Sequence, residues 1–315
     1  MRRTLWAPLA LSVLVPLVFQ AQAAHAVTGA ASGGTGVAAV ATPEAGSVRA
    51  GSTHGTTAAP AAKPRPKATP KSRTRPRTVV ALTFDDGDRS HTMAAKLLER
   101  HGLRGTFYIN SGDLGTKGKL TRAQAAAIAK AGHEIGGHTV NHERLTDLAP
   151  EEQTETICAD RRALLGMGLT VRTFAYPYGA VDASARQAAR DCGYNAARTI
   201  GGIAQGPCRD CVVAEPTRPE RVYEIRTPGS VRESTTLADM KRYVLRAEQS
   251  GGGLLPLAFH KVCARGCGTF SVRTAVLDQF LGWLAKRERH GTAVRTLADV
   301  TGGRVRPVPE EPAAL

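Results

Sequence analysis

Aromatic and acidic side chains are both scarce in this 315-residue chain. Only 5% of the residues are aromatic, and 27 acidic residues stand against 42 Lys and Arg residues, which leaves a formal net charge of +15. Such a charge can indicate nucleic-acid binding, but few rings are available to stack on bases, so we exclude nucleic acid as a partner. Beyond residue 26 no apolar run approaches the length of about 18 residues that a membrane-spanning helix needs. We therefore expect no stable membrane insertion of the mature chain.

The N-terminus has the pattern of a secretory signal peptide over residues 1–26. Arg2 and Arg3 precede the apolar run Leu5–Phe19, and two A-x-A sites follow within residues 21–26. An uncleaved membrane anchor is the alternative, but the run is short for a span, so we favour cleavage. No cysteine follows the run directly, which argues against a lipid anchor. We expect a secreted, extracellular protein, with association with the cell wall as a further expectation.

Residues 27–77 lack large apolar side chains almost entirely. Ala, Gly, Thr, Ser and Pro dominate this segment, and such a composition buries too little surface to fold, so we expect a disordered linker. Its last part, residues 63–77, contains seven cations, four prolines and no acid. We expect this part to be extended and to contact an anionic cell-envelope polymer, with a plain soluble spacer as the alternative.

Six cysteines lie beyond residue 150, and in an exported chain an even number indicates disulfides. The count alone leaves the connectivity open. Two of the cysteines lie on expected helices that flank one strand, and the other four form two locally close pairs. We expect the pairs Cys158–Cys192, Cys208–Cys211 and Cys263–Cys267. A structural zinc site built on the C-x2-C and C-x3-C spacings is the alternative.

From residue 78 onward, segments typical of strands and helices alternate. Apolar runs predict strands, and apolar periodicity with N-cap residues and stop glycines predicts helices. The expected strands are 78–83, 105–109, 133–137, 171–175, 194–198, 221–226, 254–260 and 293–297. The expected helices are 93–101, 122–131, 150–165, 182–193, 236–248 and 272–289. This βα repeat predicts an α/β fold with a parallel, barrel-like sheet of about seven or eight strands, and a doubly wound open sheet is the alternative.

Two short motifs in this region carry side chains that bind metals. Asp85 and Asp86 directly follow the apolar segment 79–82, and His138 and His142 lie four residues apart after a Gly-Gly pair. Each motif alone is weak, because Asp-Asp-Gly is commonly a turn and paired histidines are commonly ordinary. Together, two histidines and one carboxylate supply three metal ligands and leave positions open for water and substrate. The other carboxylate can act as a base on that water, so the sequence predicts metal-assisted hydrolysis at the C-terminal ends of strands.

Three segments of the chain match a known pattern. They are Thr83–Gly87 (TFDDG), His138–His142 (HTVNH) and Phe174–Gly179 (FAYPYG). With them the sequence resembles the polysaccharide deacetylases of carbohydrate esterase family 4, over about residues 78–300 and most densely over 78–200. The resemblance implies a distorted parallel (β/α) barrel of about seven units over 78–300, with 301–315 as a C-terminal tail. It also implies removal of acetyl groups from an N-acetylated glycan, such as peptidoglycan, a chitin-type polymer or poly-N-acetylglucosamine.

The resemblance further implies a role for each matching residue. The metal, usually zinc but also another divalent ion such as Co²⁺, would be held by Asp86, His138 and His142. Asp85 would be the general base, and the backbone around Tyr178 would help to bind the oxyanion. His260 would be the general acid. The implied partner is an acetylated polysaccharide substrate.

The chain also departs from the family pattern. Ala175 stands where many members have an Arg that orients the base, and the usual Asp-Trp motif is not recognisable. Arg226 could supply that cation, although a surface role is the simpler interpretation. Three other functions stay open: an esterase acting on O-acetylated polysaccharide, a non-catalytic metal-containing glycan-binding protein, and a non-haem iron enzyme. The presence of both Asp85 and His260 argues against the non-catalytic alternative.

Overall fold

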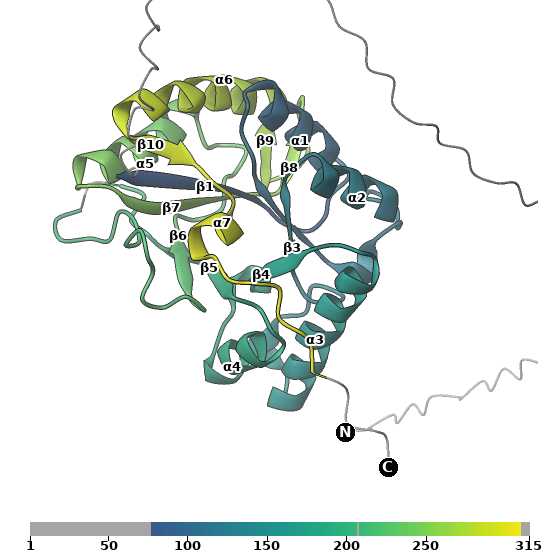
Figure 1. Ribbon diagram of the computed structural model, residues 1–315. Coiled ribbons are helices and arrows are strands. Elements are labelled where there is room, and N and C mark those ends of the chain that lie inside the picture. Colours follow the sequence, from purple (N-terminus) through teal and green to yellow (C-terminus); the bar gives the residue numbers. More distant parts are fainter. Residues whose placement is uncertain (1–76, 207, 310–315) are drawn as a thin grey trace, which may run out of the picture. The chain divides into compact units, whose positions relative to one another are not determined.

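The computed structural model describes residues 77–206 and 208–309, so the predicted signal peptide and linker, up to residue 76, lie outside the described residues. Strands and helices alternate through these ranges (Figure 1). The strands are β1 Thr78–Phe84, β2 Thr106–Ile109, β3 Glu134–Gly137, β4 Val171–Ala175, β5 Ala196–Gly202, β6 Ile225–Thr227, β7 Gly253–Phe259, β8 Lys261–Cys263, β9 Ser271–Arg273 and β10 Thr292–Val294. The helices are α1 His91–Arg100, α2 Arg122–Lys130, α3 Pro150–Gly166, α4 Ala183–Asp191, α5 Leu237–Gln249, α6 Thr274–Ala285 and α7 Leu297–Thr301. In this part of the chain, no helix has the length and apolar content needed to cross a bilayer.

Strands β1 to β7 form a parallel sheet that curls until its ends meet. The neighbours follow the order β6, β5, β4, β3, β2, β1, and β7 pairs with the whole length of β1. On the other side, the backbone N–H of Val231, just after β6, donates to the Ala258 carbonyl in β7 at 2.8 Å. Glu215 forms an isolated bridge with Leu254, also in β7. The expected fold, a distorted parallel barrel of about seven units, is confirmed.

The distortion lies at β10. This strand pairs with the first three residues of β1, Thr78–Val80, whereas β2 pairs only with the last two, Thr83 and Phe84. Because β7 occupies the opposite edge of β1 along its full length, β10 and β2 share one edge. The barrel is therefore widened at the N-terminal end of β1 by a strand from the far end of the chain.

Helix α7 covers the N-terminal ends of the strands. Thr296 caps it, and its first residue, Leu297, donates its backbone N–H to Thr106 Oγ1 at 3.0 Å. The next N–H, from Ala298, donates to the buried carboxylate of Glu134 at 2.8 Å. Since Thr106 begins β2 and Glu134 begins β3, the barrel is capped at this end, and only the C-terminal ends of the strands lead to the surface.

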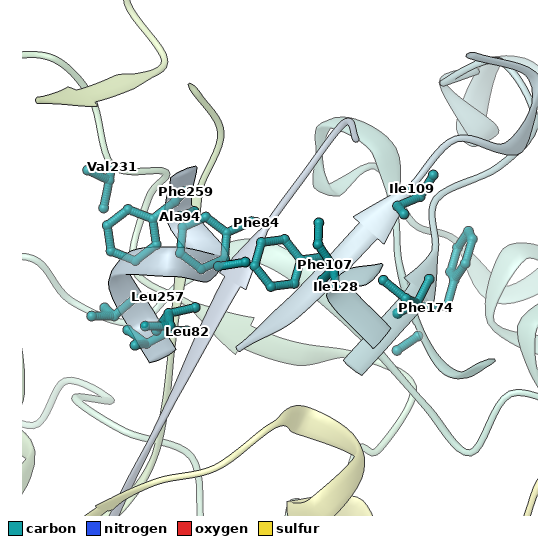
Figure 2. Close-up of a cluster of buried hydrophobic side chains, with 14 of the residues drawn as sticks. Leu82, Phe84, Ala94, Phe107, Ile109, Ile128, Phe174, Val231, Leu257 and Phe259 are labelled. Carbon is teal, nitrogen blue, oxygen red and sulfur yellow. The ribbon is translucent and has the colours of Figure 1, made fainter. Parts of the chain in front are cut away.

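The larger part of the core lies between the barrel and its helices. Figure 1 shows the helices around the outside of the strands. Alternate residues of β1, Val80, Leu82 and Phe84, point into this outer layer and are fully buried. Phe84 stacks between Phe107 and Phe259, with ring centroids 4.9 and 5.2 Å away (Figure 2). This apolar face holds the strands in register and thereby sets where their ends lie.

The opposite faces of the strands fill the barrel interior. A second buried cluster lies there: Val79, Ala81, Tyr108, Ala175, Ala196, Ile225, Leu254 and Leu297. Gly136 has no side chain because a Cβ would lie 2.4 Å from the Tyr108 ring. Side chains alternate along a strand, so the inward set of β1 continues to Asp85 and that of β7 continues to His260. The interior therefore opens directly onto the predicted site.

Several sequence-based boundaries were wrong. The strand expected at 194–198 spans Ala196–Gly202, and three further differences have a visible cause. The strand expected at 221–226 begins only at Ile225, because residues 221–224 form a turn in which the Glu224 N–H donates to the Arg221 carbonyl. The strand expected at 293–297 ends at Val294, because Thr296 caps helix α7, which begins at Leu297. The helix expected at 272–289 begins at Thr274, because β9 pairs with β8 just before it.

All six cysteines form disulfides within the described residues. The pairs are the expected ones, Cys158–Cys192, Cys208–Cys211 and Cys263–Cys267. The first joins α3 to the end of α4, and the third closes the loop between β8 and β9. A zinc site built on these cysteines is therefore excluded.

Candidate metal centre and active site

The C-terminal ends of the barrel strands surround a cavity of about 690 Å³. Its lining comes from the segments that follow β1, β3, β4, β6 and β7, from β5 and β8, and from the loop between β8 and β9. All six residues that the sequence assigned to the site line it: Asp85, Asp86, His138, His142, Tyr178 and His260. The fold thus brings these distant positions into one place, and their individual roles stay predictions.

Asp86 and the two motif histidines form a ligand set for a metal. Asp86 Oδ1 lies 3.4 Å from His138 Nε2 and 3.2 Å from His142 Nε2, and the three ligand atoms all lie within 4.8 Å of one another. Ligand atoms of a tetrahedral zinc, each bound at about 2.0–2.2 Å, are separated by about 3.4 Å. Asp86 Oδ1 is also buried without a hydrogen-bond donor in the described part of the chain. The residues therefore fit a divalent metal with one further position open.

The charge of Asp86 suits this role. Burial by itself raises the pKa of this carboxyl, but the imidazoles of His138 and His142 lower it by more. The pKa of Asp86 is therefore well below its ordinary value, and the side chain is an anion at neutral pH. An anionic oxygen beside two imidazole nitrogens is the donor set that zinc prefers.

His138 is oriented from both its ring and its backbone. Its Nδ1 lies 2.7 Å from the Ala175 carbonyl oxygen, which can only accept, so Nδ1 carries the proton and Nε2 keeps its lone pair for the metal. Its backbone N–H donates to Asp160 Oδ2 at 2.9 Å, and Asp160 Oδ1 accepts the Ser111 N–H at 2.9 Å. Burial raises the pKa of Asp160 to about 7. The imidazole is thus fixed before any metal binds.

Left-handed backbone conformations gather at the site. Four of the five non-glycine residues with positive φ in the described ranges belong to its motifs: Asp86 (75°), Thr139 (65°), His142 (62°) and Tyr178 (59°). Each such residue costs about 1 kcal/mol or more. The Asn110 amide supports one of these turns, donating to the carbonyls of His138 and Thr139. The surroundings therefore hold strained turns that aim the site residues into the cavity.

Asp85 faces a different set of partners from its neighbour. Its Oδ1 accepts from Arg198, and its Oδ2 lies 3.9 Å from His260 Nε2. Burial raises the pKa of Asp85, but the positive charges of Arg198 and of the histidines outweigh it, and the net pKa is lowered. Asp85 is therefore a buried carboxylate whose partners differ from those of Asp86, and it can accept a proton.

Arg198 is the functional residue that the sequence interpretation missed. It lies on β5, is 0% exposed, and its guanidinium sits 4.9 Å from the centre of the Tyr108 ring. Its partner in the β4–β5 register is Ala175, the position where related sequences were expected to have an Arg. The cation therefore reaches Asp85, the predicted base, from the neighbouring strand, and the small Ala175 side chain leaves room for it. The available signal was the inward position of Arg198 on a strand next to the third motif.

Arg226 does not replace the missing cation. Its guanidinium pairs with Glu215, with Nε 2.7 Å from Oε1, and its side chain is 37% exposed. This agrees with the surface role that was the simpler interpretation of the sequence. Of the two arginines, Arg198 pairs with the predicted base Asp85, whereas Arg226 does not.

His260 follows β7, the strand that pairs with β1, and its ring lies beside Asp85. Its carbonyl accepts a hydrogen bond from the buried His91 ring at 2.9 Å, which holds the end of β7. Burial lowers the pKa of the His260 imidazole, although the charge of Asp85 opposes this. Its ring also lies 5.3 Å from Phe270. The resting imidazole is therefore neutral at neutral pH and can receive a proton inside the cavity.

The two tyrosines of the third motif have different surroundings. Tyr176 is fully buried, and its hydroxyl donates to the Tyr223 carbonyl at 2.9 Å, so it holds the turn in place. Tyr178 is 57% exposed, and its ring lies 4.6 Å from the His142 ring. Both tyrosines line the cavity, but only the Tyr178 ring is exposed to it.

Over part of its length the chain is similar to known polysaccharide deacetylases. A family profile described as polysaccharide deacetylase matches residues 72–197. The peptidoglycan-N-acetylglucosamine deacetylase PgdA of Listeria monocytogenes is 31% identical over 117 residues, which are 36% of this chain and 24% of PgdA. The chitooligosaccharide deacetylase of Azorhizobium caulinodans is 32% identical over 112 residues, 34% of this chain and 51% of that protein. The chain thus spans about half or less of the length of the curated relatives it matches.

One solved structure with a similar arrangement is the Xyl-CE4 domain of a multidomain xylanase from the hindgut metagenome of Trinervitermes trinervoides. It is 17% identical, with a TM-score of 0.47, and the match covers 71% of this chain and 89% of that domain.

Proposed function

Because this chain belongs to the polysaccharide deacetylase family, carbohydrate esterase family 4, we propose that it is a metal-dependent hydrolase that removes acetyl groups from an N-acetylated glycan. One observation carries the proposal: the adjacent carboxylates have separate partners. Asp86 faces His138 and His142, whereas Asp85 faces Arg198 and His260. A ligand and a base are both needed for metal-assisted amide hydrolysis, and this division supplies one of each. Peptidoglycan, chitin-type oligomers and poly-N-acetylglucosamine are the candidate substrates.

Asp86, His138 and His142 would hold the metal. Bound zinc, or another divalent ion such as Co²⁺, would polarise the acetyl carbonyl and lower the pKa of a water molecule. The chain contributes the orientation of the ligands, through the hydrogen bond of His138 to the Ala175 carbonyl. It also contributes the negative charge of Asp86, which balances part of the charge of the ion.

Asp85 would accept the proton of the attacking water. Arg198 keeps Asp85 ionised and fixes one of its oxygens, so the other oxygen is available to the water. Because His260 is neutral at rest, the proton that it delivers must be gained within the site. Asp85 Oδ2, 3.9 Å from His260 Nε2, is placed to pass that proton on. His260 would then protonate the sugar nitrogen as the C–N bond breaks, which releases acetate and a free amine.

The turn at Tyr178 would receive the oxyanion that develops on the acetyl carbonyl. Tyr178 lies in the 3-10 turn Pro177–Gly179 at φ 59° and lines the cavity next to the metal ligands. Backbone N–H groups fixed in a turn stabilise developing negative charge without having to reorient. We assign this task to the backbone N–H of Tyr178 rather than to its phenol.

The same proposal extends to where the protein acts. The predicted leader and the basic linker support secretion and contact with an anionic polymer of the cell envelope. Fractionation of cells into medium, wall and cytoplasm tests this, and a cytoplasmic full-length chain is the opposing result.

The decisive test of activity is acetate release from a panel of acetylated glycans, with and without a chelator. We expect release from N-acetylated oligomers that stops on chelation and returns with zinc. His260→Ala should lower turnover of an N-acetyl substrate by roughly 10²–10⁴-fold and of an activated acetyl ester by much less, because an alkoxide leaves without the help of an acid. Metal content should not change, since His260 is not a ligand in this proposal. Equal losses on amide and ester would contradict the assigned role.

A further inference from the structure

The cavity walls carry two exposed aromatic rings. Among the described residues only four large hydrophobic side chains are exposed, and two of them, Tyr178 (57%) and Phe270 (46%), line this cavity. Aromatic side chains that line a cavity are typical of sites that bind a ligand. Tyr178 lies beside His142, and Phe270 lies beside His260, so one ring stands on each side of the reaction centre. Such rings pack well on the C–H faces of sugar rings.

Each ring has a guanidinium group stacked on it. The Arg144 guanidinium carbon lies 4.3 Å from the Tyr178 ring centre, and that of Arg232 lies 5.3 Å from the Phe270 ring centre. Stacking on a ring holds the planar guanidinium while leaving its N–H edge free to bind an anion. A sugar placed on either ring would therefore have an Arg edge beside it.

The cations that line the central cavity form no close ion pair with the acids around them among the described residues. The adjoining hollows add Asp239, which pairs with Arg242, and Asp88, next to Arg89. Lys261 and Arg232 both line the cavity and are exposed, and neither forms an ion pair in the described ranges, while Arg144 has only Asp147 at 3.9 Å. The acids that line the cavity are Asp85 and Asp86, which face Arg198 and the metal ligands. Away from the reaction centre the lining is thus positively charged.

The hollow continues beyond the reaction centre in two directions. A cavity of about 570 Å³ shares Gly229, Ser230 and Arg232 with the central one, and a cavity of about 440 Å³ shares Lys261 and Cys267 with it. The shared cations therefore stand where the central cavity passes into its neighbours. Groups on the sugars next to the one being deacetylated would meet them.

We propose that this groove selects an acetylated glycan whose sugars carry carboxylate groups, with Arg144, Arg232 and Lys261 as the residues that determine this preference. The inference rests on the proposed deacetylase function and adds the charge of the substrate to it. A neutral N-acetylated oligomer would fill the same groove but would leave the three cations without partners. A carboxylate on a neighbouring sugar would pair with an Arg edge in the planar, two-point geometry that guanidinium groups favour.

The test compares matched substrates that differ only in charge. One pair is a tetrasaccharide of alternating N-acetylglucosamine and its 3-O-lactyl derivative, as the free acid and as the methyl ester. A second pair, alternating N-acetylglucosamine and glucuronate, distinguishes a lactyl from a uronate carboxylate. An exposed ion pair changes an equilibrium by up to about fivefold, so two engaged cations predict a kcat/KM for the acid about tenfold above that for the ester. The advantage should shrink towards one in about 1 M salt.

Charge-removing variants locate the effect. Arg232→Gln and Lys261→Gln should each reduce the acid-to-ester ratio by about threefold, whereas the control Lys130→Gln, an exposed lysine on α2, should leave it unchanged. The Kd of each oligomer for the zinc-loaded Asp85→Asn protein gives the same comparison without turnover. Failure to release acetate from any glycan would remove the proposed function, and the binding ratio would still decide the charge preference. Equal affinity and equal kcat/KM for acid and ester would overturn the inference.

Discussion

The contact between Arg198 and Asp85 gives the sharpest test of how this site works. Both side chains are almost completely buried, with 0% and 3% exposed, so solvent screens the pair very little. Arg198→Met keeps the length and apolar contact of the side chain over Tyr108 but removes the charge. Breaking a buried ion pair in this way costs about 3–5 kcal/mol of stability, because the remaining charge is left unpaired. For a domain of this size we expect the melting temperature to fall by about 10 °C.

The same change should alter catalysis more than folding. Without Arg198, burial is opposed only by the more distant histidines, so the pKa of Asp85 rises and the acidic limb of the kcat/KM profile moves to higher pH. Turnover should fall by roughly 10²–10⁴-fold, since a misoriented base loses most of its effect. The metal content should stay the same, because Arg198 touches none of the three ligands.

The pH dependence of the unfolding free energy is an independent test of whether Arg198 lowers the pKa of Asp85. The folded-state pKa of Asp85 is lowered, so its contribution to stability is present above the unfolded pKa of about 3.9 and is lost as the pH falls through the folded value. The difference in unfolding free energy between wild type and Arg198→Met should therefore be full at neutral pH and should shrink in strong acid. Denaturant titrations at several pH values measure it.

Two controls make this reasoning refutable. Arg226→Met removes a half-exposed cation that pairs with Glu215 away from the base, and it should leave the pH profile in place. Arg198→Ala combined with Ala175→Arg returns a guanidinium to the adjacent strand position, and it should recover part of the lost turnover. If Arg198→Met instead retained wild-type kcat/KM and the same acidic limb, Asp85 would not depend on this cation.

Further outcomes follow from the same contacts. Asp86→Asn should lose the metal together with activity, whereas Asp85→Asn should keep the metal and lose turnover. Elemental analysis and an activity assay distinguish the two variants. Loss of the metal from both would refute the division of roles. Gly137→Ala should lower the melting temperature of the domain, because a Cβ there would lie 1.9 Å from Tyr194 Oη. The control Gly166→Ala should leave the melting temperature unchanged, because a Cβ there would have nothing within 4 Å. Calorimetry measures both. Replacing Cys158 and Cys192 by Ala should cost about 3–4 kcal/mol, since their bond closes a loop across 34 positions, and removing the Cys208–Cys211 bond should cost far less in the same denaturation assay.

Local sequence predicted the elements that depend on nearby residues. Short-range patterns signal the strand that begins at Thr78, the helix capped by Thr121 and the helix that begins at Pro150, and the structure contains all three. The segments at 221–226 and 293–297 were misassigned because their strand-like composition competes with a turn and with a capping threonine. Where two conformations compete, neighbouring residues alone do not determine the secondary structure. The outcome depends on which hydrogen bonds the rest of the barrel supplies.

The sequence by itself determined which side chains are candidates for the chemistry of this site. Adjacent carboxylates after an apolar strand, and two histidines four residues apart after paired glycines, identify the candidate ligands and base because ligand type and spacing are local properties. Only the tertiary structure decided which cation reaches Asp85, the predicted base, and which charges line the groove. Arg198 meets Asp85 because β5 lies beside β4 with Arg198 opposite Ala175, and no short-range pattern records that pairing. Arg144 and Arg232 likewise face one cavity only because the closed barrel brings the ends of distant strands together.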